Sequence, residues 1–508
     1  MSILDKIVSS VFPEAGLRRA VARTKLDMLG SSARSYDAGK AGHRTGGWQG
    51  VSGKSANAEI GVALPNIRDR SRDLVRNNSY AAKAVNALVS GIVGSGIIPE
   101  PKTGTDRQQM ATEEVWNAWA EQCDADGALD FYGIQALVMR CVVESGECLV
   151  RFRARRPKDS LAVPFQLQVL EPDFIDTSRY GTDKDGYTVD GIKFDRQGRR
   201  VGYWLFDQHP GSNRMMSGIT SRLVDAADVL HIFDKLRPGQ DRGVPWLAPV
   251  VLRMWDLATY DEAELIRKRI EACLAAFVEQ EPGGDARSIG RLSDGTSTDG
   301  AGTTRLESFE PGMIEYMRPG EKVTFAEPKS AGGYGEYMSV QLHAVAAGIG
   351  VTYEQLTGDL SLVNYSSYRA GHLEFRALCE RTRWQLMVNQ FSAPVWRRFM
   401  QAGFASGALK RIDVMVEWVS PPWQSIDPVK EADADLTLMR LGLKTLKDAL
   451  TERGKDFADW LPEMTTTMKA LDDAGIILDS DPRKRSKNGQ AISTTGGTPD
   501  GGSTNAGA

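Results

Sequence analysis

The sequence predicts an α+β chain of several domains. Apolar and polar residues alternate between Cys148 and Phe233, which is typical of strands with one buried face. On either side of that stretch, apolar residues recur at the three- and four-residue spacing of helices. A length of 508 residues suggests about three domains at roughly 150 residues each.

The first half of the chain is expected to run from an arm through helices into the β-rich stretch. Residues 1–63 are basic and then rich in Gly and Ser, which indicates a surface arm. Ser79 can cap a helix whose apolar positions share one face: Ala81, Ala84, Val85, Leu88, Val89 and Ile92. Residues 192–194 and 201–206 flank a turn at 196–198, which predicts a hairpin.

The second half predicts three long helices. The first covers 246–277, with Pro245 and Pro249 at its start, where a missing N–H costs little. Residues 281–304 are rich in Gly, Ser, Thr and Asp and predict a mobile loop, and 305–328 return to short strands. The second helix covers 335–347, and the third covers 367–401, where Pro394 predicts a kink.

The chain is expected to end in a strand, a helical section and a tail. Residues 412–418 alternate as one more strand. Asp427 and Pro428 form an N-cap and N1 pair that opens a last helical section reaching residue 477. Residues 479–508 are of low complexity and are expected to be disordered.

Composition excludes several classes of protein. Sixty-two Lys and Arg against 66 Asp and Glu give a net charge of −4, without the basic excess of a nucleic-acid clamp. Five cysteines without CxxC spacing indicate neither a disulfide scaffold nor a zinc knuckle. The most apolar stretch, 84–98, is too short and too rich in glycine to span a bilayer, and no secretory signal is visible. We therefore expect a soluble protein, made in the cytoplasm, with no membrane partner.

Catalytic and cofactor motifs are weak throughout. The nearest approach to a phosphate-binding loop, 47–55, has five residues between its glycines instead of four and no strand before it. The five histidines are scattered, and His231 in an apolar strand favours a hydrogen-bonded core residue over a metal ligand. The run Asp124, Asp126, Asp130 lacks the order of an EF-hand loop. The sequence predicts no catalytic residue, no metal and no cofactor.

Two helices this long, flanking a loose insertion, are awkward to bury inside one compact domain. Their leftover apolar stripes point to partner helices, including copies of the same chain. The candidate interface residues on the first helix are Met254, Trp255, Leu265, Ile266, Ile270 and Phe277.

Many small motifs, spread in one order over roughly residues 30–475, resemble the portal proteins of tailed phages, specifically the lambda-like group. They are 35–38 before Trp48, 70–78, 93–97, Glu144-Ser145-Gly146-Glu147, 170–173, 237–240 with Gly243-Val244-Pro245, 311–312 with 319–321, 353–359 and 364–367. Residues before 30 and after 479 take no part in the resemblance.

The resemblance implies a portal fold with a β-rich wing, long stem helices, a small α/β clip and a helical crown. Mapped by order, the parts are an N-terminal arm (1–63), the wing (64–240), a first stem helix (241–280), the clip (281–330), a second stem helix (331–351), a tunnel loop (352–366), a long wing helix (367–405), a wing strand with the crown (406–478) and the tail (479–508).

The resemblance also implies function and partners. It implies a homo-oligomeric ring of about twelve subunits at one capsid vertex, whose channel carries double-stranded DNA during packaging and ejection. The clip would meet the terminase large subunit and later the head-completion or connector proteins, through residues such as Asp285, Arg287, Arg291 and Asp294. The wing and crown would face the major capsid protein, scaffolding protein and packaged DNA.

The tunnel loop has a composition that suits a sliding duplex. Residues 351–365 contain no Lys or Arg, so the loop would add no salt-dependent drag from phosphate contacts. Gly358 is expected to let the loop flex, with 357–361 as its tip. The residues expected to face the channel are Glu354, Thr357, Gly358, Asp359, Leu360, Ser361 and Asn364.

Two other functions stay open from the sequence. One is a DNA-processing nucleotide hydrolase of the same packaging machinery, which would need a phosphate loop and paired metal carboxylates. The other is a structural adaptor that does not form a ring. Subunit number, processing of the tail and the host are not set by the sequence.

Overall fold

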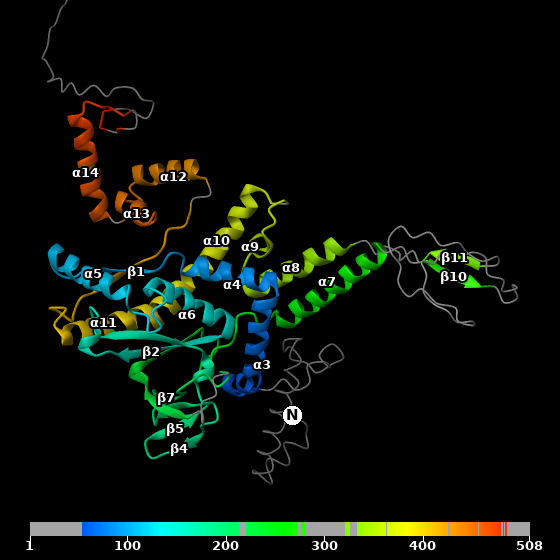
Figure 1. Cartoon of the computed structure of the whole chain (residues 1–508). Helices are drawn as coiled ribbons and strands as arrows, with labels where there is room; N and C mark the ends of the chain where they lie inside the picture. The colour runs from blue at the N-terminus through cyan, green and yellow to red at the C-terminus, as the bar shows by residue number, and fades with distance from the viewer. Residues whose placement is uncertain are drawn as a thin grey trace, which may run out of the picture. The chain divides into compact units, whose positions relative to one another are not determined.

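The computed structural model describes residues 53–212, 220–272, 276–280, 321–325, 333–361, 363–424, 427–455, 457–478, 481 and 483–484. Contacts divide the chain into two units, Met1–Glu59 and Ile60–Ala508, and apart from the first turn of one helix the described helices and strands belong to the second. Helices and antiparallel sheets are both present, which confirms the α+β class (Figure 1). In the described part, no helix is long and apolar enough to cross a membrane.

Four helices form the N-terminal part of the core: α3 (Ala56–Asn77), α4 (Ser79–Ile92), α5 (Asp106–Ala120) and α6 (Phe131–Ser145). The predicted stripe on α4 is confirmed, except that Val89 is only partly buried. The cap is one residue earlier than predicted, because the Asn78 side chain accepts the N–H groups of Tyr80 and Ala81. An aromatic cluster joins α5 and α6 to α11 (Ala393–Ser406). Its members are Trp116, Trp119, Phe131, Trp396 and Phe399.

Two sheets make up the β-rich body. The first has the order β3-β2-β9, from β2 (Glu147–Ala154), β3 (Phe165–Leu170) and β9 (Val229–Phe233). The second runs β4 (Gly181–Thr182), β5 (Gly186–Val189), β6 (Ile192–Asp195), β7 (Arg200–Phe206) and β8 (Ser221–Asp225) in that order. The β6–β7 pairing confirms the predicted hairpin. A separate pair joins β1 (Ile98–Pro101) to β12 (Val416–Val419), so the strand predicted over 412–418 is shorter and begins later.

The first long helix is shorter than predicted. It is α7 (Val251–Ala272), whereas 276–280 form strand β10 (Ala276–Gln280), paired antiparallel with β11 (Glu321–Phe325). Phe277 therefore lies in a strand and not on the helix. The segment Ala276-Phe277-Val278 is aromatic and β-branched, which suits a paired strand better than a helix end.

The second and third helices lie close to their predicted positions. The second is α8 (Tyr334–Ile349), followed by the short α9 (Tyr353–Thr357). The third is a continuous helical run from α10 (Tyr365–Thr382) through a π-helix, η7 (Arg383–Ser392), into α11 (Ala393–Ser406). Pro394 is the second residue of α11, where its missing N–H cannot donate to the preceding turn. Ten residues of π-helix come just before α11, and the kink predicted at Pro394 stays a prediction.

The C-terminal helices begin where predicted. Asp427 caps α12 (Pro428–Arg440) by accepting the Lys430 N–H, with Pro428 as the first residue. The section then breaks into α13 (Leu446–Thr451) and α14 (Phe457–Asp473). Lys444 holds the turn between α12 and α13, with Nζ 2.7 Å from an Asp435 oxygen.

A buried ion cluster at Glu147 joins these parts. Its carboxylate accepts from Arg68 Nη2 at 2.8 Å and from Arg242 Nη2 at 2.5 Å, both on Oε1. The Gly243 N–H at 2.8 Å and His231 Nε2 at 2.9 Å meet Oε2. Burial opposes ionisation of Glu147, but Arg242, His231 and Arg68 outweigh it and hold the pKa well below its usual range. His231 is thus the hydrogen-bonded core histidine that was predicted, and burial lowers its pKa, which keeps it neutral at pH 7.

Two glycines allow the cluster to close. Gly146 ends α6 with φ +90°, and a Cβ there would lie 2.6 Å from the backbone nitrogen of Pro245. A Cβ on Gly243 would lie 2.1 Å from the Gly146 carbonyl oxygen. Real Cβ atoms do not approach backbone so closely, so both positions require glycine. The segment before α7 therefore lies directly against the start of β2.

Replacing Glu147 by Gln should destabilise the fold strongly, because it leaves two buried arginines without their counter-charge. We expect a loss of about 3–5 kcal/mol in the free energy of unfolding, measured by urea denaturation at pH 7. Asp413→Asn, which removes an exposed ion pair with Arg411, is the control and should leave the midpoint nearly unchanged. Equal midpoints for the two variants would contradict the importance of the cluster.

Candidate functional site

The predicted stem helices α7 and α8 pack on each other through one face of each. Met254 and Leu257 on α7, and Met338 and Leu342 on α8, are buried in the chain's main hydrophobic core. Polar bonds extend the contact: Arg253 Nη1 lies 2.7 Å from Gln341 Oε1, and the Tyr334 hydroxyl donates to Asp261. That bond to Asp261 raises the pKa of Tyr334 to about 12, so the hydroxyl keeps its proton.

The predicted interface residues divide into buried, exposed and undescribed ones. Met254 is buried in the chain's own core, with 1% of its surface exposed. Trp255, Leu265 and Ile266 are 60%, 52% and 47% exposed, and Leu252, which was not predicted, is 69% exposed. The side chain of Ile270 lies outside the described residues, as does that of Phe277. α7 therefore carries an apolar surface that the described residues leave exposed.

The loop from 352 to 366 has more structure than predicted. Thr352 and Gln355 form a capping box that starts α9, and Leu356 anchors that helix with 1% of its surface exposed. Gly358 ends the helix in the left-handed conformation, with φ +81°. Its role is therefore that of a helix C-cap, not only that of a flexible point in a loop.

A tight turn of exposed residues follows Gly358. The Asp359 N–H donates to Thr357 Oγ1 at 3.1 Å, and the Ser361 N–H donates to Asp359 Oδ1 at 2.9 Å. Bonds from the Ser361 side chain and backbone lower the pKa of Asp359, so it is anionic at neutral pH. Leu360 in this turn is 58% exposed. The turn thus presents an anion and an apolar side chain.

The two ends of the loop are fixed to the body. His343 on α8 stacks on Tyr353, with ring centroids 4.1 Å apart. Asn364 caps α10 by accepting the Ser367 N–H at 2.9 Å, so it acts as a helix cap. One cation comes near from another element, since Lys430 Nζ lies 4.9 Å from the ring centroid of Tyr365. The sequence of the loop alone could not reveal this neighbour.

The predicted clip contacts, Asp285, Arg287, Arg291 and Asp294, lie outside the described residues. Of the predicted clip, the structure describes β11, which pairs with β10 from the end of the segment predicted as the first stem helix.

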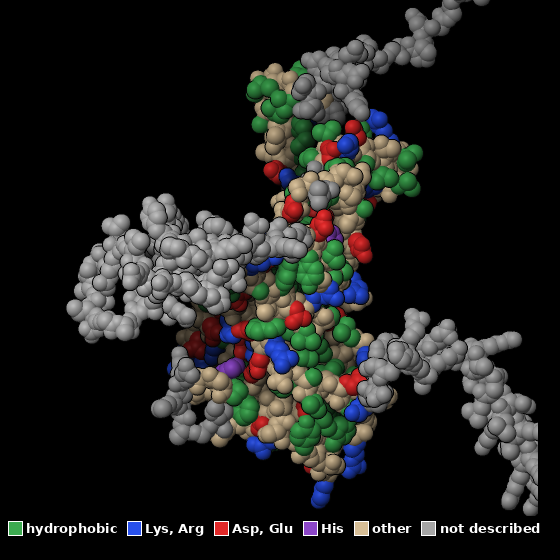
Figure 2. Space-filling view, turned by 90° about the vertical axis from the view of Figure 1, so that its right-hand side faces the viewer, with side chains coloured by type: hydrophobic (Ala, Val, Ile, Leu, Met, Phe, Trp, Pro, Cys, Tyr) green, Lys and Arg blue, Asp and Glu red, His purple; other side chains and the backbone are tan. Residues whose placement is uncertain are grey.

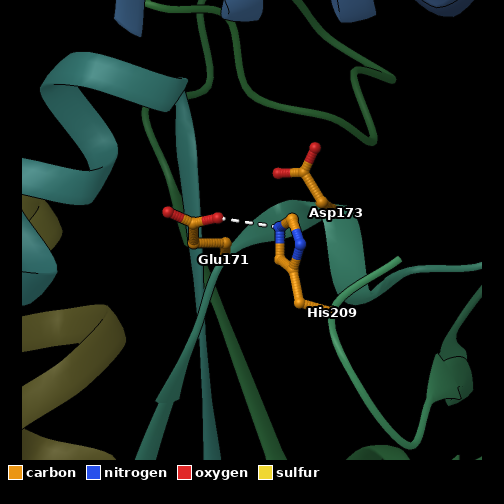
Figure 3. Close-up of side chains that lie close together, drawn as sticks. All are labelled: Glu171, Asp173 and His209. Atoms are coloured by element: carbon orange, nitrogen blue, oxygen red, sulfur yellow. Dashed lines mark ion pairs between the residues drawn. The ribbon is translucent and has the colours of Figure 1, made fainter. Parts of the chain in front are cut away.

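One cluster with metal-ligand chemistry was not predicted. Glu171, Asp173 and His209 bring one potential ligand atom each within 4.8 Å of one another (Figure 3). His209 Nε2 lies 2.9 Å from Glu171 Oε2, and Arg72 Nη2 lies 2.5 Å from Asp173 and 3.5 Å from Glu171. Arg72 already pairs with both carboxylates, so we assign no metal to this cluster.

Comparison with known proteins identifies the family. Residues 41–383 match the family model described as phage portal protein, lambda family. The match covers more than half of the chain, so this protein belongs to the lambda family of phage portal proteins.

Individual relatives agree along most of the sequence. The chain is 26% identical over 435 residues to a probable portal protein of Halomonas phage phiHAP-1, covering 81% of each chain. It is 25% identical over 470 residues to the portal protein of Escherichia phage N15, covering 81% of this chain and 85% of that one. It is 23% identical over 445 residues to portal protein B of Escherichia phage lambda, covering 78% and 82%.

Solved structures overlap more weakly. The neck of the native GTA particle gives a TM-score of 0.42 at 14% identity, covering 75% of this chain and 92% of that one. An HK97 family phage portal protein from Corynebacterium diphtheriae gives 0.32 at 10% identity, covering 71% and 95%. At these scores the family assignment rests on the sequence matches. Portal proteins are components of the virion capsid, and the relatives' names are those of structural proteins.

Proposed function

We propose that this chain is the subunit of a portal ring at one capsid vertex, through which double-stranded DNA enters and leaves the head. The observation that carries the proposal is the family match over residues 41–383, with relatives aligned over about four fifths of the chain. The ring, of about twelve subunits, is assembled in the host cytoplasm with scaffolding and major capsid proteins. It docks the terminase large subunit during packaging and head-completion or connector proteins afterwards.

The exposed face of α7 supports ring formation. At 100° per residue, Leu252, Trp255 and Ile266 lie on one side of the helix, away from Met254 and Leu257. On α8, Tyr337 and Val340 are likewise exposed, 46% and 65%. Figure 2, viewed from the right-hand side of Figure 1, shows hydrophobic side chains in patches between charged ones. When the α7 stripe of one subunit meets the α8 stripe of the next, the contact is heterologous, and it forms a ring where the rotation between neighbours closes.

Ile266→Asp should weaken the ring, because it buries an unpaired carboxylate between neighbouring helices. Native mass spectrometry should show a shift from rings to small species at equal protein concentration. Lys268→Ala is the control, since it changes an exposed side chain away from the Leu252, Trp255 and Ile266 side of the helix and should leave rings intact. Unchanged rings for Ile266→Asp would contradict this placement of the interface.

The turn at 357–361 is the part of the loop best suited to meet the duplex. It is exposed, it contains the anionic Asp359, and the 351–365 segment has no Lys or Arg. Each neutralised phosphate adds affinity and salt-dependent drag, so an uncharged or anionic turn lets DNA slide. Its internal hydrogen bonds hold it as a firm steric contact. We infer that the loop brushes the duplex without gripping it.

Asp359→Lys combined with Ser361→Lys should slow or stall packaging, since each subunit of the ring would add two phosphate-binding cations. The measurement is DNA filling of proheads against time, at two salt concentrations, because added salt should partly restore the rate. The uncharged pair Asp359→Asn and Ser361→Asn is the control and should fill normally. Filling at the wild-type rate by the lysine variant would disprove the low-friction mechanism.

Simple measurements on the purified protein distinguish the portal ring from the two alternatives, a nucleotide hydrolase and a non-ring adaptor. Negative-stain images of the purified protein should show rings with a central channel. A nucleotide hydrolase would release phosphate from ATP, and we expect no release above a buffer control. A non-ring adaptor would elute at the mass of a single chain on size exclusion under every buffer tried, and that result would overturn the proposal.

A further inference from the structure

A charged recess lies beside the five-stranded sheet, away from the stem helices and the tunnel loop. It is a cavity of about 570 Å³ between that sheet and the exposed face of the three-stranded sheet. Its charged lining residues are Arg151, Arg153, Arg222, Asp207, Asp225 and Asp228. No motif in the sequence pointed to it, because its walls come from strands β2, β7 and β8 and the turn after them.

Strand β8 brings an open edge to this recess. In the described part of the chain, β8 ends the sheet order and pairs with β7 alone. Four consecutive residues, 222–225, line the cavity. Residues 205–207, at the end of β7, line it as well, so the cavity lies at the β7–β8 end of the sheet, where β8 is the outermost strand. Such an edge has backbone N–H and C=O groups available to a further strand.

Two of the three arginines that line the recess form no ion pair among the described residues. Arg222 is paired with Asp207, with Nη2 and Oδ1 2.6 Å apart. Asp228 is paired with Arg398 from α11 at 2.9 Å, and Asp225 accepts the Ala227 N–H. Arg151 and Arg153 are the two without an ion pair. Burial and then the neighbouring Arg153 lower the pKa of Arg151, although Asp228 and Asp207 act in the opposite direction.

The spacing of these two arginines selects the ligand. They lie two residues apart on one face of β2, about 7 Å along the strand. An extended peptide with acidic residues at every second position has the same repeat on one face. The edge of β8 favours a peptide over a nucleic acid here, because a peptide backbone can pair with the N–H and C=O groups of that strand.

We propose that this recess binds an extended acidic segment of another protein, which adds as a strand to the edge of β8 and places its carboxylates on Arg151 and Arg153. Backbone hydrogen bonds give the affinity, and the two arginines select acidic side chains. The portal ring is not needed for this site, so it stands or fails independently of the channel function.

The test uses the full chain and short, fluorescein-labelled peptides in which Glu alternates with Thr. Binding of the peptide to the protein is measured by fluorescence anisotropy. Arg151→Gln with Arg153→Gln should weaken binding by at least about tenfold. Arg107→Gln, an exposed arginine on α5, is the matched control and should bind as the wild type does. Methylating alternate backbone nitrogens of the peptide should abolish its binding to the wild-type protein. This arm of the test changes only the peptide, so it does not depend on whether a protein variant folds.

Three results would overturn the proposal. One is that the methylated peptide binds as tightly as the unmethylated one, which would contradict the addition of a strand to β8. Another is that the peptide with Lys in place of Glu binds as tightly as the Glu peptide, which would contradict the selection for acidic side chains. The third is duplex DNA binding more tightly than the Glu peptide and losing that affinity in the double variant, which would make the recess a nucleic-acid site.

Discussion

The carboxylate of Glu147 is the constraint on which the rest of the chain depends. A fully buried anion is tolerable only if cations and N–H groups meet it from every side, and here they come from α3, β9 and the segment before α7. The hydrogen bonds and ion pairs to the two carboxylate oxygens of Glu147 therefore fix three elements relative to β2. The 240–245 segment precedes α7, so the same contacts hold the approach to that helix against the start of β2. The three-stranded sheet and the approach to α7 are thus joined by one buried cluster.

The sequence predicted the parts of the fold that short-range patterns encode. The period-two stretch, the β6–β7 hairpin and the Asp427-Pro428 helix start all depend on residues close in the chain. The Glu147 cluster could not be predicted, because Arg68 and Arg242 are 79 and 95 residues away and look like ordinary surface arginines. Phe277 was misplaced for a related reason: whether 276–280 continue a helix depends on pairing with 321–325 across a long insertion.

The candidate site was predictable in composition but not in geometry. The absence of Lys and Arg from 351–365 is visible in the sequence, and so are the motifs that resemble lambda-like portals. Their physical meaning needed the structure: Glu144-Ser145-Gly146-Glu147 and Gly243-Val244-Pro245 meet at the buried cluster, with glycines where a Cβ would strike backbone. Likewise, Gly358 looked like a point of freedom, yet it caps α9 and places Asp359 in a bonded turn. Composition cannot show which backbone groups a side chain will meet.

Two surfaces that the described residues leave open, the α7 stripe and the recess at β8, have opposite chemistry, and that difference bears on how long each contact should last. The α7 stripe is apolar, so covering it gains hydrophobic free energy without removing charges from water, which suits a permanent contact. The recess at β8 is lined by arginines and carboxylates, so a partner there must replace their water, and its attraction weakens as salt rises. A subunit built this way can join a lasting assembly through its helices while keeping its sheet edge for a partner that binds and leaves.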